Sequence, residues 1–423
     1  MSLILKNTTF IHRETLDFSG GHIKVEEGTD GSFTFYKDFG KVDISPEDEV
    51  VDCGGKLVMR SFAVGHHHAY SALARGMPPP VKTPENFLEI LKYIWWNLDK
   101  ALDRDSVEAS ALATAIACAK AGATFVIDHH ASPNFIGGSL ELIAQAFDKV
   151  GVSHLLCYEI TDRDGLDKAE KGLEETESYL RNNQGLVGLH ASFTVSDDTL
   201  SKAVGLMQKY NSGIHIHVAE DEYDQQQCMT EHGKRVVERL HDFGVLESSK
   251  TILGHCLHLT DTEHEIVKNS EAFIVQNTES NLNNNVGFFS SKGLGNRIML
   301  GTDGMHSDMI RSAQAAYFVG QSKDEIDFRS AYDRFVMVHN YLKVNKFSGD
   351  GDNNLVVLDY ESPTEVNQNN FLGHFIFGFS SRDVQHVISD GRLIVKDKKV
   401  CRVNEEEVME FAREQAEKLW KKL

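Results

Sequence analysis

Short apolar runs alternate with longer amphipathic stretches over residues 57–345. Each run has the length of a buried strand and each intervening stretch the length of a helix, which predicts repeated strand–helix units. One stretch shows the helical spacing well, because Val236, Leu240 and Phe243 lie on one face and Gly244 follows as a stop. Eight runs can be counted, at residues 57–64, 123–127, 152–160, 185–190, 213–218, 250–254, 272–275 and 297–300.

Eight strand–helix units favour an α/β fold with a (β/α)8 TIM barrel at its centre. A doubly wound open sheet has the same alternation of strands and helices and is the alternative. The two folds differ in closure, because only a barrel places the eighth strand beside the first. We expect the barrel to occupy residues 57–349.

Both ends of the chain have a different pattern, in which short β-type runs are separated by turn residues. Residues 350–423 return to the pattern of residues 1–56 and end in a helix that begins at Asn404. The two ends are expected to form one small β-sandwich domain, composed of residues 1–56 and 350–423. Its C-terminal strands are expected at residues 354–358, 374–379, 384–389 and 392–396.

Composition and charge exclude several classes of protein. Of the 423 residues, 41% are hydrophobic and 25% are charged, which is typical of a soluble globular protein. A net charge of −20 argues against nucleic acid as a partner, because no basic block is present to neutralise phosphates. No apolar run reaches the length of a membrane helix, and the first residues lack the pattern of a signal peptide. We therefore expect a cytoplasmic protein that binds neither nucleic acid nor membranes.

Three consecutive histidines, His66, His67 and His68, follow the first apolar run. A histidine cluster at a strand end, taken alone, is more often structural than metal-binding. Side chains alternate along a strand, so His66 and His68 are predicted to point into the barrel while His67 points away. The first strand therefore offers two imidazole ligands, and His67 is expected to be structural.

Two later strand ends carry further side chains that can bind a metal. The fifth run ends in His217, with Glu220 just beyond it, and Asp303 follows the eighth run. Alone, His217 fits a core histidine and Asp303 a turn residue before glycine. In a closed barrel the metal-binding interpretation becomes the better one, because closure brings His217 and Asp303 to the same end of the barrel as the first-strand histidines. Imidazoles and a carboxylate from separate strand ends are how a barrel enzyme binds a catalytic metal.

Other strand ends add histidines to this mouth of the predicted barrel. His255 ends the sixth strand, and because tetrahedral zinc with a bound water has few protein positions, we expect it to serve the water or the substrate. His190 ends the fourth strand. His129 and His130 end the second strand, and for this pair a structural role and a role in the site carry equal weight.

The ordered set of strand-end motifs resembles the amidohydrolase superfamily and, within it, the ATZ/TRZ-type aminohydrolases. The resemblance covers almost the whole chain. The sequences after Gly65 and around His190 are similar to those of SsnA-like aminohydrolases, a branch associated with purine breakdown. The motifs are H-x-H at His66, H-V-A-E at His217, H-C-x-H-L at His255, N-x-x-S-N from Asn277 to Asn281 and G-T-D-G around Asp303.

The resemblance implies one divalent metal ion, which we expect to be zinc, with iron as the alternative. Binuclear relatives use a carboxylated lysine at the end of the fourth strand, where this chain has no lysine, so a single ion is expected. The implied metal ligands are His66, His68, His217 and Asp303. The implied catalytic residues are Glu220, His255 and Asp303, and the candidate substrate contacts are His190, Asn281, His306 and Trp96.

Trp96 belongs to a long aromatic segment between the first and second apolar runs, together with Phe87, Tyr93 and Trp95. An aromatic stripe is more often part of a core or a dimer interface than of a pocket. Loops at this end of a barrel also set specificity, so a wall for a planar heterocycle is the other interpretation. One departure from the relatives is Thr278, where they commonly have proline, and it puts the shape of the seventh loop in question.

The implied reaction is hydrolysis of a carbon–nitrogen bond, other than a peptide bond, in a nitrogen heterocycle. The metal would lower the pKa of its water to about 7. Asp303 would accept the water proton, Glu220 would protonate a ring nitrogen, and His255 would orient the nucleophile. We expect deamination of a purine-like or pterin-like ring. The alternatives are ring opening of a cyclic amide at the same site and a metal-binding relative without catalysis.

Two kinds of partner are expected. One is the small heterocyclic substrate, and the other is a second copy of the chain in a homodimer or higher homo-oligomer.

Overall fold

The computed structural model describes residues 2–423 and contains an eight-stranded parallel barrel. Each strand is hydrogen-bonded in parallel to the next one in the chain. The ring closes where the backbone N–H groups of Thr302 and Asp303 donate to the carbonyl of His66, at 3.0 and 3.2 Å. This closure confirms the predicted (β/α)8 barrel and excludes the open sheet. The strands are β6 (Phe62–His67), β7 (Ala123–His130), β8 (Ser153–Ile160), β9 (Val187–Ala191), β10 (Ile214–Val218), β11 (Ile252–His255), β12 (Phe273–Gln276) and β13 (Ile298–Leu300).

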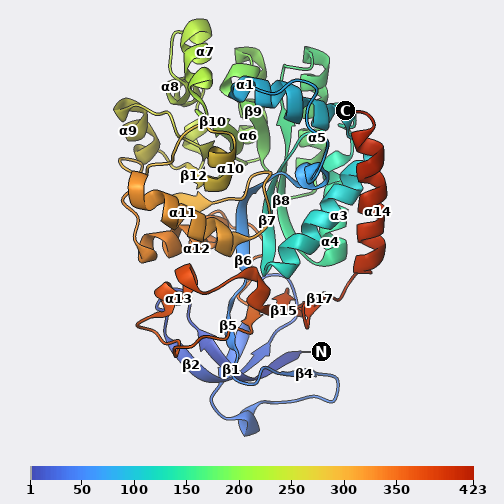
Figure 1. The fold of residues 1–423 in the computed structure, drawn as a ribbon, viewed down its shortest axis with the longest axis vertical. Coiled ribbons are helices and arrows are strands. Elements are labelled where there is room, and N and C mark those ends of the chain that lie inside the picture. The colour runs from blue at the N-terminus through green and yellow to red at the C-terminus, as the bar shows by residue number, and fades with distance from the viewer. Residues whose placement is uncertain (1) are drawn as a thin grey trace.

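Helices connect these strands and cover the outside of the barrel (Figure 1). None of the helices within residues 2–423 is long and apolar enough to cross a membrane. The connection from β6 to β7 holds η2 (Ala69–Ala74), α1 (Phe87–Ile90), η3 (Leu91–Trp95), α2 (Trp96–Ala101) and α3 (Arg104–Lys120). The later helices are α4 (Ser139–Val150), α5 (Leu166–Leu180), η4 (Ser192–Thr194), α6 (Asp197–Lys209), α7 (Glu222–His232), α8 (Val236–Asp242), η5 (Val245–Glu247), α9 (Asp261–Asn269), α10 (Thr278–Asn283), α11 (Met309–Lys323) and α12 (Phe328–Val344).

Strands from both ends of the chain form a second sheet of nine strands below the barrel (Figure 1). β14 pairs with β5, so the C-terminal strands continue the sheet begun by the N-terminal ones. The strand order is β17-β16-β15-β14-β5-β1-β2-β3, and β4 pairs with β1. The strands are β1 (Leu3–Ile11), β2 (Phe18–Val25), β3 (Phe33–Tyr36), β4 (Glu49–Asp52), β5 (Leu57–Arg60), β14 (Leu355–Leu358), β15 (Val384–Ser389), β16 (Arg392–Lys396) and β17 (Lys399–Val400). Two short 3-10 helices, η1 (Phe39–Lys41) and η6 (Ser381–Asp383), lie in their connections.

The apolar run at residues 57–64 is not one barrel strand, as the pattern predicts, but two strands in different sheets. β5 pairs with β1 and β14 in the terminal sheet, and after Ser61 the chain continues as β6 in the barrel. Both β5 and β6 are largely buried and apolar. The hydrophobic pattern therefore continues unbroken across the point where the chain leaves one sheet and enters the other. Periodicity reports burial and not the identity of the neighbouring strand.

The strand expected at residues 374–379 is wrong, because this segment is part of a helix, α13 (Phe371–Phe377). Phe371, Phe375 and Phe379 are all buried and are spaced four residues apart, which matches one face of a helix. The rings of Phe371 and Phe375 stack at 6.2 Å between centroids. A short apolar run did not distinguish a strand from a helix here.

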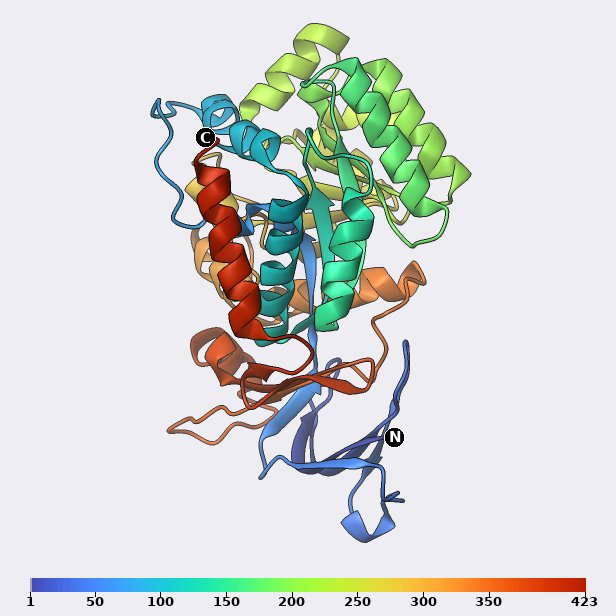
Figure 2. The same ribbon diagram turned by 90° about the vertical axis from the view of Figure 1, so that its right-hand side faces the viewer.

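The final helix, α14 (Glu405–Trp420), begins after Asn404, as the capping pattern predicts. It runs along α3 on the outside of the barrel (Figure 2). The indole N–H of Trp420 donates to the carbonyl of Leu73 at 2.8 Å, and Lys120 pairs with Glu405 at 2.5 Å. The C-terminal segment therefore contributes strands to the terminal sheet and a helix to the barrel surface.

Arg60 joins the terminal sheet to the barrel through buried charges. Its guanidinium lies 2.9 Å from Asp350, and Asp350 in turn lies 2.8 Å from His339 on α12.

Replacing Arg60 by methionine leaves the Asp350 charge buried with less compensation, so the free energy of unfolding should fall by about 3–5 kcal/mol. Chemical denaturation measures this. Arg329→Met removes an exposed pair with Asp333 and should cost less than about 1 kcal/mol; equal losses would contradict the assignment.

Candidate active site

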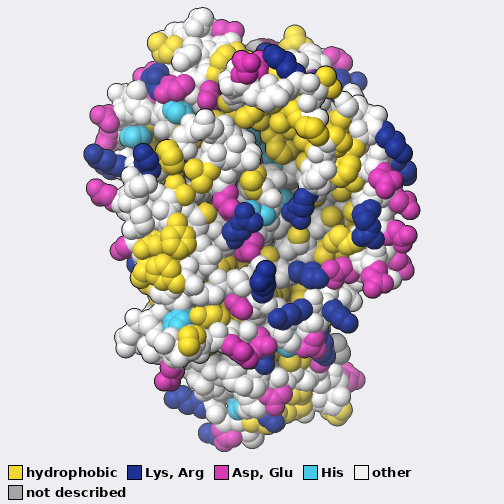
Figure 3. Space-filling model, viewed as in Figure 1, with side chains coloured by type: hydrophobic (Ala, Val, Ile, Leu, Met, Phe, Trp, Pro, Cys, Tyr) yellow, Lys and Arg dark blue, Asp and Glu magenta, His cyan; other side chains and the backbone are white. Residues whose placement is uncertain are grey.

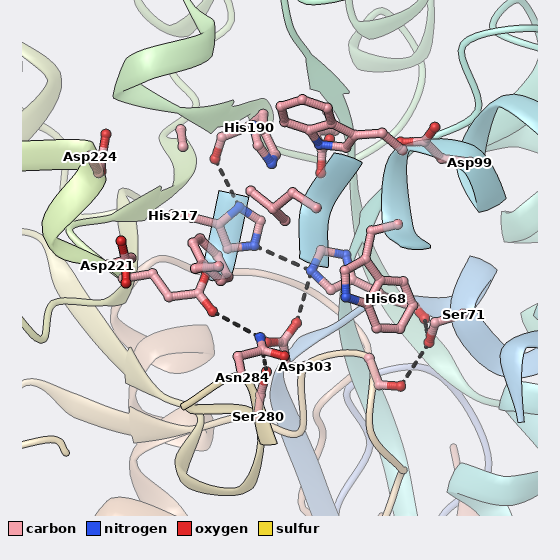
Figure 4. A pocket seen from close by; sticks show the side chains of 18 of the residues that line it. His68, Ser71, Asp99, His190, His217, Asp221, Asp224, Ser280, Asn284 and Asp303 are labelled. Atoms are coloured by element: carbon pink, nitrogen blue, oxygen red, sulfur yellow. Dashed lines mark hydrogen bonds and ion pairs between the residues drawn. The ribbon is translucent and has the colours of Figure 1, made fainter. Parts of the chain in front are cut away.

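Four buried side chains from three places in the barrel converge at its carboxyl end. His66 and His68 come from the end of β6, His217 from β10, and Asp303 from the segment after β13. The Nε2 atom of His68 lies 3.0 Å from Asp303 Oδ1 and 3.2 Å from His217 Nε2, and Nε2 of His66 lies 3.5 Å from Asp303 Oδ1. Each residue offers one ligand atom, and these atoms all lie within 4.8 Å of one another. Figure 4 shows His68, His217 and Asp303 pointing toward one another.

The hydrogen bonds of the three histidines leave one ring nitrogen of each for a metal. Nδ1 of His68 donates to the carbonyl of His129 at 2.6 Å, and Nδ1 of His217 donates to the carbonyl of His190 at 2.8 Å. The Nε2 atoms of these two rings therefore carry free lone pairs. Nε2 of His66 is buried and has no hydrogen-bond partner among residues 2–423. Three imidazole nitrogens and one carboxylate are a donor set that fits a divalent metal ion.

Three further groups of side chains near this one could hold a metal, and each shares one residue with it. Two of them share a histidine, namely the group of His68, His129 and Glu159 and the group of Glu159, His190 and His217. The third shares Asp303 and consists of Glu220, His255 and Asp303. Each shared histidine offers one nitrogen to the site, so it cannot serve two ions at once. The group of His66, His68, His217 and Asp303 can therefore hold a divalent ion without these two neighbouring groups, and a single ion stays a prediction.

A second carboxylate, Glu220, lies beside Asp303, and His255 lies between them. Nε2 of His255 is 3.5 Å from Glu220 Oε2 and 3.7 Å from Asp303 Oδ2, and it has no hydrogen-bond partner among the described residues. Its Nδ1 donates to the Asn281 side chain at 2.7 Å, which fixes the ring. Asn284 donates to Glu220 Oε1 at 3.2 Å.

The environments of Glu220 and Asp303 shift their pKa values in opposite directions. Burial raises the pKa of the Glu220 carboxyl. Burial acts in the same direction on Asp303, but the neighbouring His66 and His68 imidazoles outweigh it and hold the pKa of Asp303 well below its usual range. Two acids set apart in this way can serve as acid and base in one reaction.

The backbone turns sharply at three of the strand ends that supply these residues. Ala219, His255 and Asp303 have positive φ values of 46°, 67° and 51°, which residues other than glycine rarely adopt. Such strain persists where the surrounding structure fixes it, and it gathers at functional sites. Here it directs the side chains after β10, β11 and β13 into the barrel mouth.

The convergent side chains open into a cavity at the carboxyl end of the barrel. One wall is aromatic and apolar, and it is formed by Phe87, Leu91, Trp95 and Trp96 from the connection between β6 and β7. Trp96 and His190, two of the expected substrate contacts, line the cavity with their ring centroids 6.1 Å apart. The long aromatic segment thus lies at the cavity rather than in the barrel core.

The two other expected substrate contacts lie elsewhere. Asn281 is bonded to His255 and is not part of the cavity lining. The ring of His306 pairs with Glu279, so the structure does not bring it to the cavity. His67 points away from the site, with Nε2 3.0 Å from the Ser307 hydroxyl. His129 lies below the cavity and donates toward the carbonyls of Leu189 and His215 at 3.1 and 3.2 Å.

Several residues of the cavity were missed by sequence reasoning. Asp99, Glu159 and Arg163 line one side, and Asn284 lies beside Glu220. Asp224 accepts the backbone N–H of Ala219 at 2.9 Å, which fixes the turn before Glu220. Of these residues, only Glu159 stands out in the sequence, because it is an acidic residue inside the otherwise apolar run of the third strand.

His215 is a further residue that sequence reasoning did not assign, and it orients a proposed ligand. Its Nε2 lies 2.9 Å from Nδ1 of His66, and its Nδ1 lies 3.7 Å from the Cys157 sulfur.

Loss of such an outer hydrogen bond typically weakens metal binding by roughly 10–100-fold, so His215→Phe should raise the Kd for zinc by that factor. Competition with a chelator measures it, with His241→Phe on the exposed face of α8 as the control. Equal Kd values for both variants would rule out this role.

Comparison with known proteins agrees with this geometry. A 5'-deoxyadenosine deaminase of Methanopyrus kandleri is 28% identical over 397 residues, which cover 88% of this chain and 89% of the relative. A 5-methylthioadenosine/S-adenosylhomocysteine deaminase of Thermococcus sibiricus is 24% identical over 93% of this chain and 94% of its own length. Among solved structures, a zinc-bound adenosine deaminase of Xanthomonas campestris superposes with a TM-score of 0.84 at 17% identity, covering 99% of this chain and 98% of the other. The pattern of the amidohydrolase family matches residues 62–337, and the chain belongs to that family.

Proposed function

We propose that this protein is a metal-dependent aminohydrolase that removes an amino group from a purine-like heterocycle by hydrolysis. The observation that carries the proposal is the pair of carboxylates, Asp303 within the metal-binding group and Glu220 beside it, at the floor of a cavity with an aromatic wall. Relatives named as deaminases of adenosine-type compounds support the reaction type.

The residues would divide the proton transfers between them. A bound divalent ion would supply Lewis acidity, which makes water a nucleophile at neutral pH. Asp303, held as a carboxylate, would accept a proton from the attacking water. Glu220, whose pKa is raised by burial, would donate a proton to a ring nitrogen and later pass one to the leaving amine. His255 would orient the water between the two carboxylates.

We propose zinc as the ion, with iron as the alternative, because imidazole and carboxylate ligands accept either metal. A zinc-bound structural neighbour supports zinc. Elemental analysis of protein purified without added metal tests the choice. A protein that takes up neither ion would overturn the proposed function.

Ammonia release tests the reaction itself. The metal-loaded protein should release ammonia from at least one member of a panel of purines, pterins and triazines. Ring opening of a cyclic amide is the second candidate, because the same water could attack a ring carbonyl while the same two carboxyl groups move its proton to the nitrogen of the C–N bond that breaks. A ring-opened product without ammonia would establish that candidate in place of deamination.

We also propose that the protein is cytoplasmic and forms a homo-oligomer. The support for the oligomer is an exposed aromatic patch, in which Phe318 on α11 and Phe377 on α13 are 54% and 63% exposed with their ring centroids 5.9 Å apart. Figure 3 shows hydrophobic side chains gathered over these helices. Exposed apolar patches of this kind mark association surfaces. Light scattering on the purified protein measures the mass, and a monomer at micromolar concentration would contradict the assembly.

A further inference from the structure

A buried polar cluster lines the cavity on the side away from Glu220. Arg163 contacts the carboxylate of Asp99, lies 3.5 Å from Glu159 Oε1, and has its guanidinium carbon 5.2 Å from the centre of the Trp96 ring. All four side chains line the cavity. In Figure 4, Asp99 lies on the opposite side of His68 and His217 from Asn284, the residue that bonds to Glu220.

Three polar atoms of this cluster lack a hydrogen-bond partner. Glu159 Oε1, Asp99 Oδ1 and Trp96 Nε1 are buried and accept or donate no hydrogen bond among residues 2–423, although Glu159 Oε1 has the Arg163 guanidinium 3.5 Å away as an ion pair. Asp99 is 1% exposed and Glu159 is 3% exposed, so bulk water does not compensate for the missing bonds. A buried polar atom without a partner is costly and calls for an explanation. Two acceptors and one donor at a cavity wall indicate a ligand with matching groups.

The position of Glu159 shows which part of a ligand it faces. One carboxylate oxygen of Glu159 lies within 4.8 Å of the ligand nitrogens of His190 and His217. Glu159 therefore lies beside the reacting end of the site and not at the mouth of the cavity. A group that satisfies Glu159 belongs to the ring that is hydrolysed, whereas a sugar attached to that ring would lie farther out.

We propose that the substrate is a heterocyclic lactam, a ring with an N–H next to a carbonyl, whose N–H donates to Glu159 and whose carbonyl accepts from Trp96 Nε1. The inference rests on the proposed function. The opposite side of the reacting carbon must then carry a nitrogen with a free lone pair, which Glu220 protonates. Guanine has this arrangement around its amino-bearing carbon. An adenine-type ring has no such N–H, because the second ring neighbour of its amino-bearing carbon is a carbon atom without a hydrogen, so the Glu159 carboxylate would stay unpaired.

Matched purines test this directly on the zinc-loaded protein. Guanine should be hydrolysed with a kcat/KM at least roughly 10²-fold above that of 1-methylguanine, in which a methyl group replaces the relevant hydrogen, and of adenine. A site built to accept a hydrogen bond rejects an analogue without the donor, because its own buried group stays unpaired. Equal kcat/KM values for guanine and 1-methylguanine, or a preference for adenine or 5'-deoxyadenosine, would overturn the inference and leave the proposed function intact.

A variant of Glu159 provides the second test. Glu159→Gln replaces a charged acceptor by a neutral amide and should reduce the preference for guanine over 1-methylguanine at least roughly 10-fold. Glu170→Gln, a matched change on the exposed face of α5, should leave the preference unchanged. Zinc content and the thermal unfolding midpoint identify a variant that has not folded. An unchanged preference in folded Glu159→Gln would overturn the role of Glu159.

A binding measurement separates failure of the inference from failure of the proposed function. If no member of the panel of purines, pterins and triazines releases ammonia, the proposed deamination fails. Calorimetry with xanthine and 1-methylxanthine then still decides the lactam contact, because binding needs no turnover. Xanthine should bind at least roughly 10-fold more tightly than 1-methylxanthine, and equal affinities would overturn the inference.

Discussion

Replacing Glu220 by glutamine is expected to lower kcat by roughly 10³-fold while the metal content stays the same. The reason is that Glu220 lies beside His255, 3.5 Å away, and is not one of the proposed ligands His66, His68, His217 and Asp303, although it could form a second group with His255 and Asp303. Glutamine keeps the shape and the bond from Asn284 but has no acidic proton to transfer to a ring nitrogen. Steady-state kinetics on the best substrate, together with elemental analysis, measure both quantities.

Glu222→Gln is the matched control for this variant, because its side chain is 62% exposed two residues further along. It should retain kcat within about twofold, as surface substitutions usually perturb little. Loss of metal from Glu220→Gln would show that Glu220 is a ligand. Full activity with the metal retained would show that another group transfers the proton.

Replacing His68 by alanine is expected to remove both the metal and the activity, with kcat/KM reduced by roughly 10³-fold or more. His68 contacts both Asp303 and His217, so its loss removes one ligand from the centre of the group. His67→Ala is the control within the same triplet. His67 is buried with Ser307 and Asp128, so its loss should cost about 1–3 kcal/mol of stability but leave the metal stoichiometry unchanged.

Elemental analysis and thermal unfolding of the two variants separate the roles of these neighbouring histidines. Loss of metal from His67→Ala in a folded protein would contradict the division that strand alternation predicts. Retention of a full equivalent of metal by His68→Ala would contradict the proposed ligand set.

The sequence predicted the barrel and the meeting of its strand ends because both follow from periodicity. Alternation on one strand put His66 and His68 together, and closure of the ring put Asp303 beside them. These are consequences of regular geometry, so they can be worked out from spacing alone. The same geometry gave no position for His306, which lies in an irregular segment and turns toward Glu279.

The lining of the cavity could not be predicted in this way. Asp99 comes from α2 and Arg163 from the loop after β8, and they meet only because the connection between β6 and β7 folds back over the barrel. No motif or period relates them. The division of one apolar run into β5 and β6 was hidden for a similar reason, since both strands are buried and only their hydrogen-bond partners differ.

The shared terminal sheet has a consequence for the order in which the chain can fold. β5 has its neighbour β14 on the far side of the entire barrel sequence, and α14 completes the surface of α3 later still. During synthesis, β1 to β5 can pair with one another, but the edge of β5 that pairs with β14 must remain open until the barrel has been made. Contacts so distant in sequence form slowly, and strand edges left open meanwhile favour aggregation. Expression at lower temperature or with chaperones is accordingly expected to raise the yield of soluble protein, and shortening the chain before β14 to abolish it.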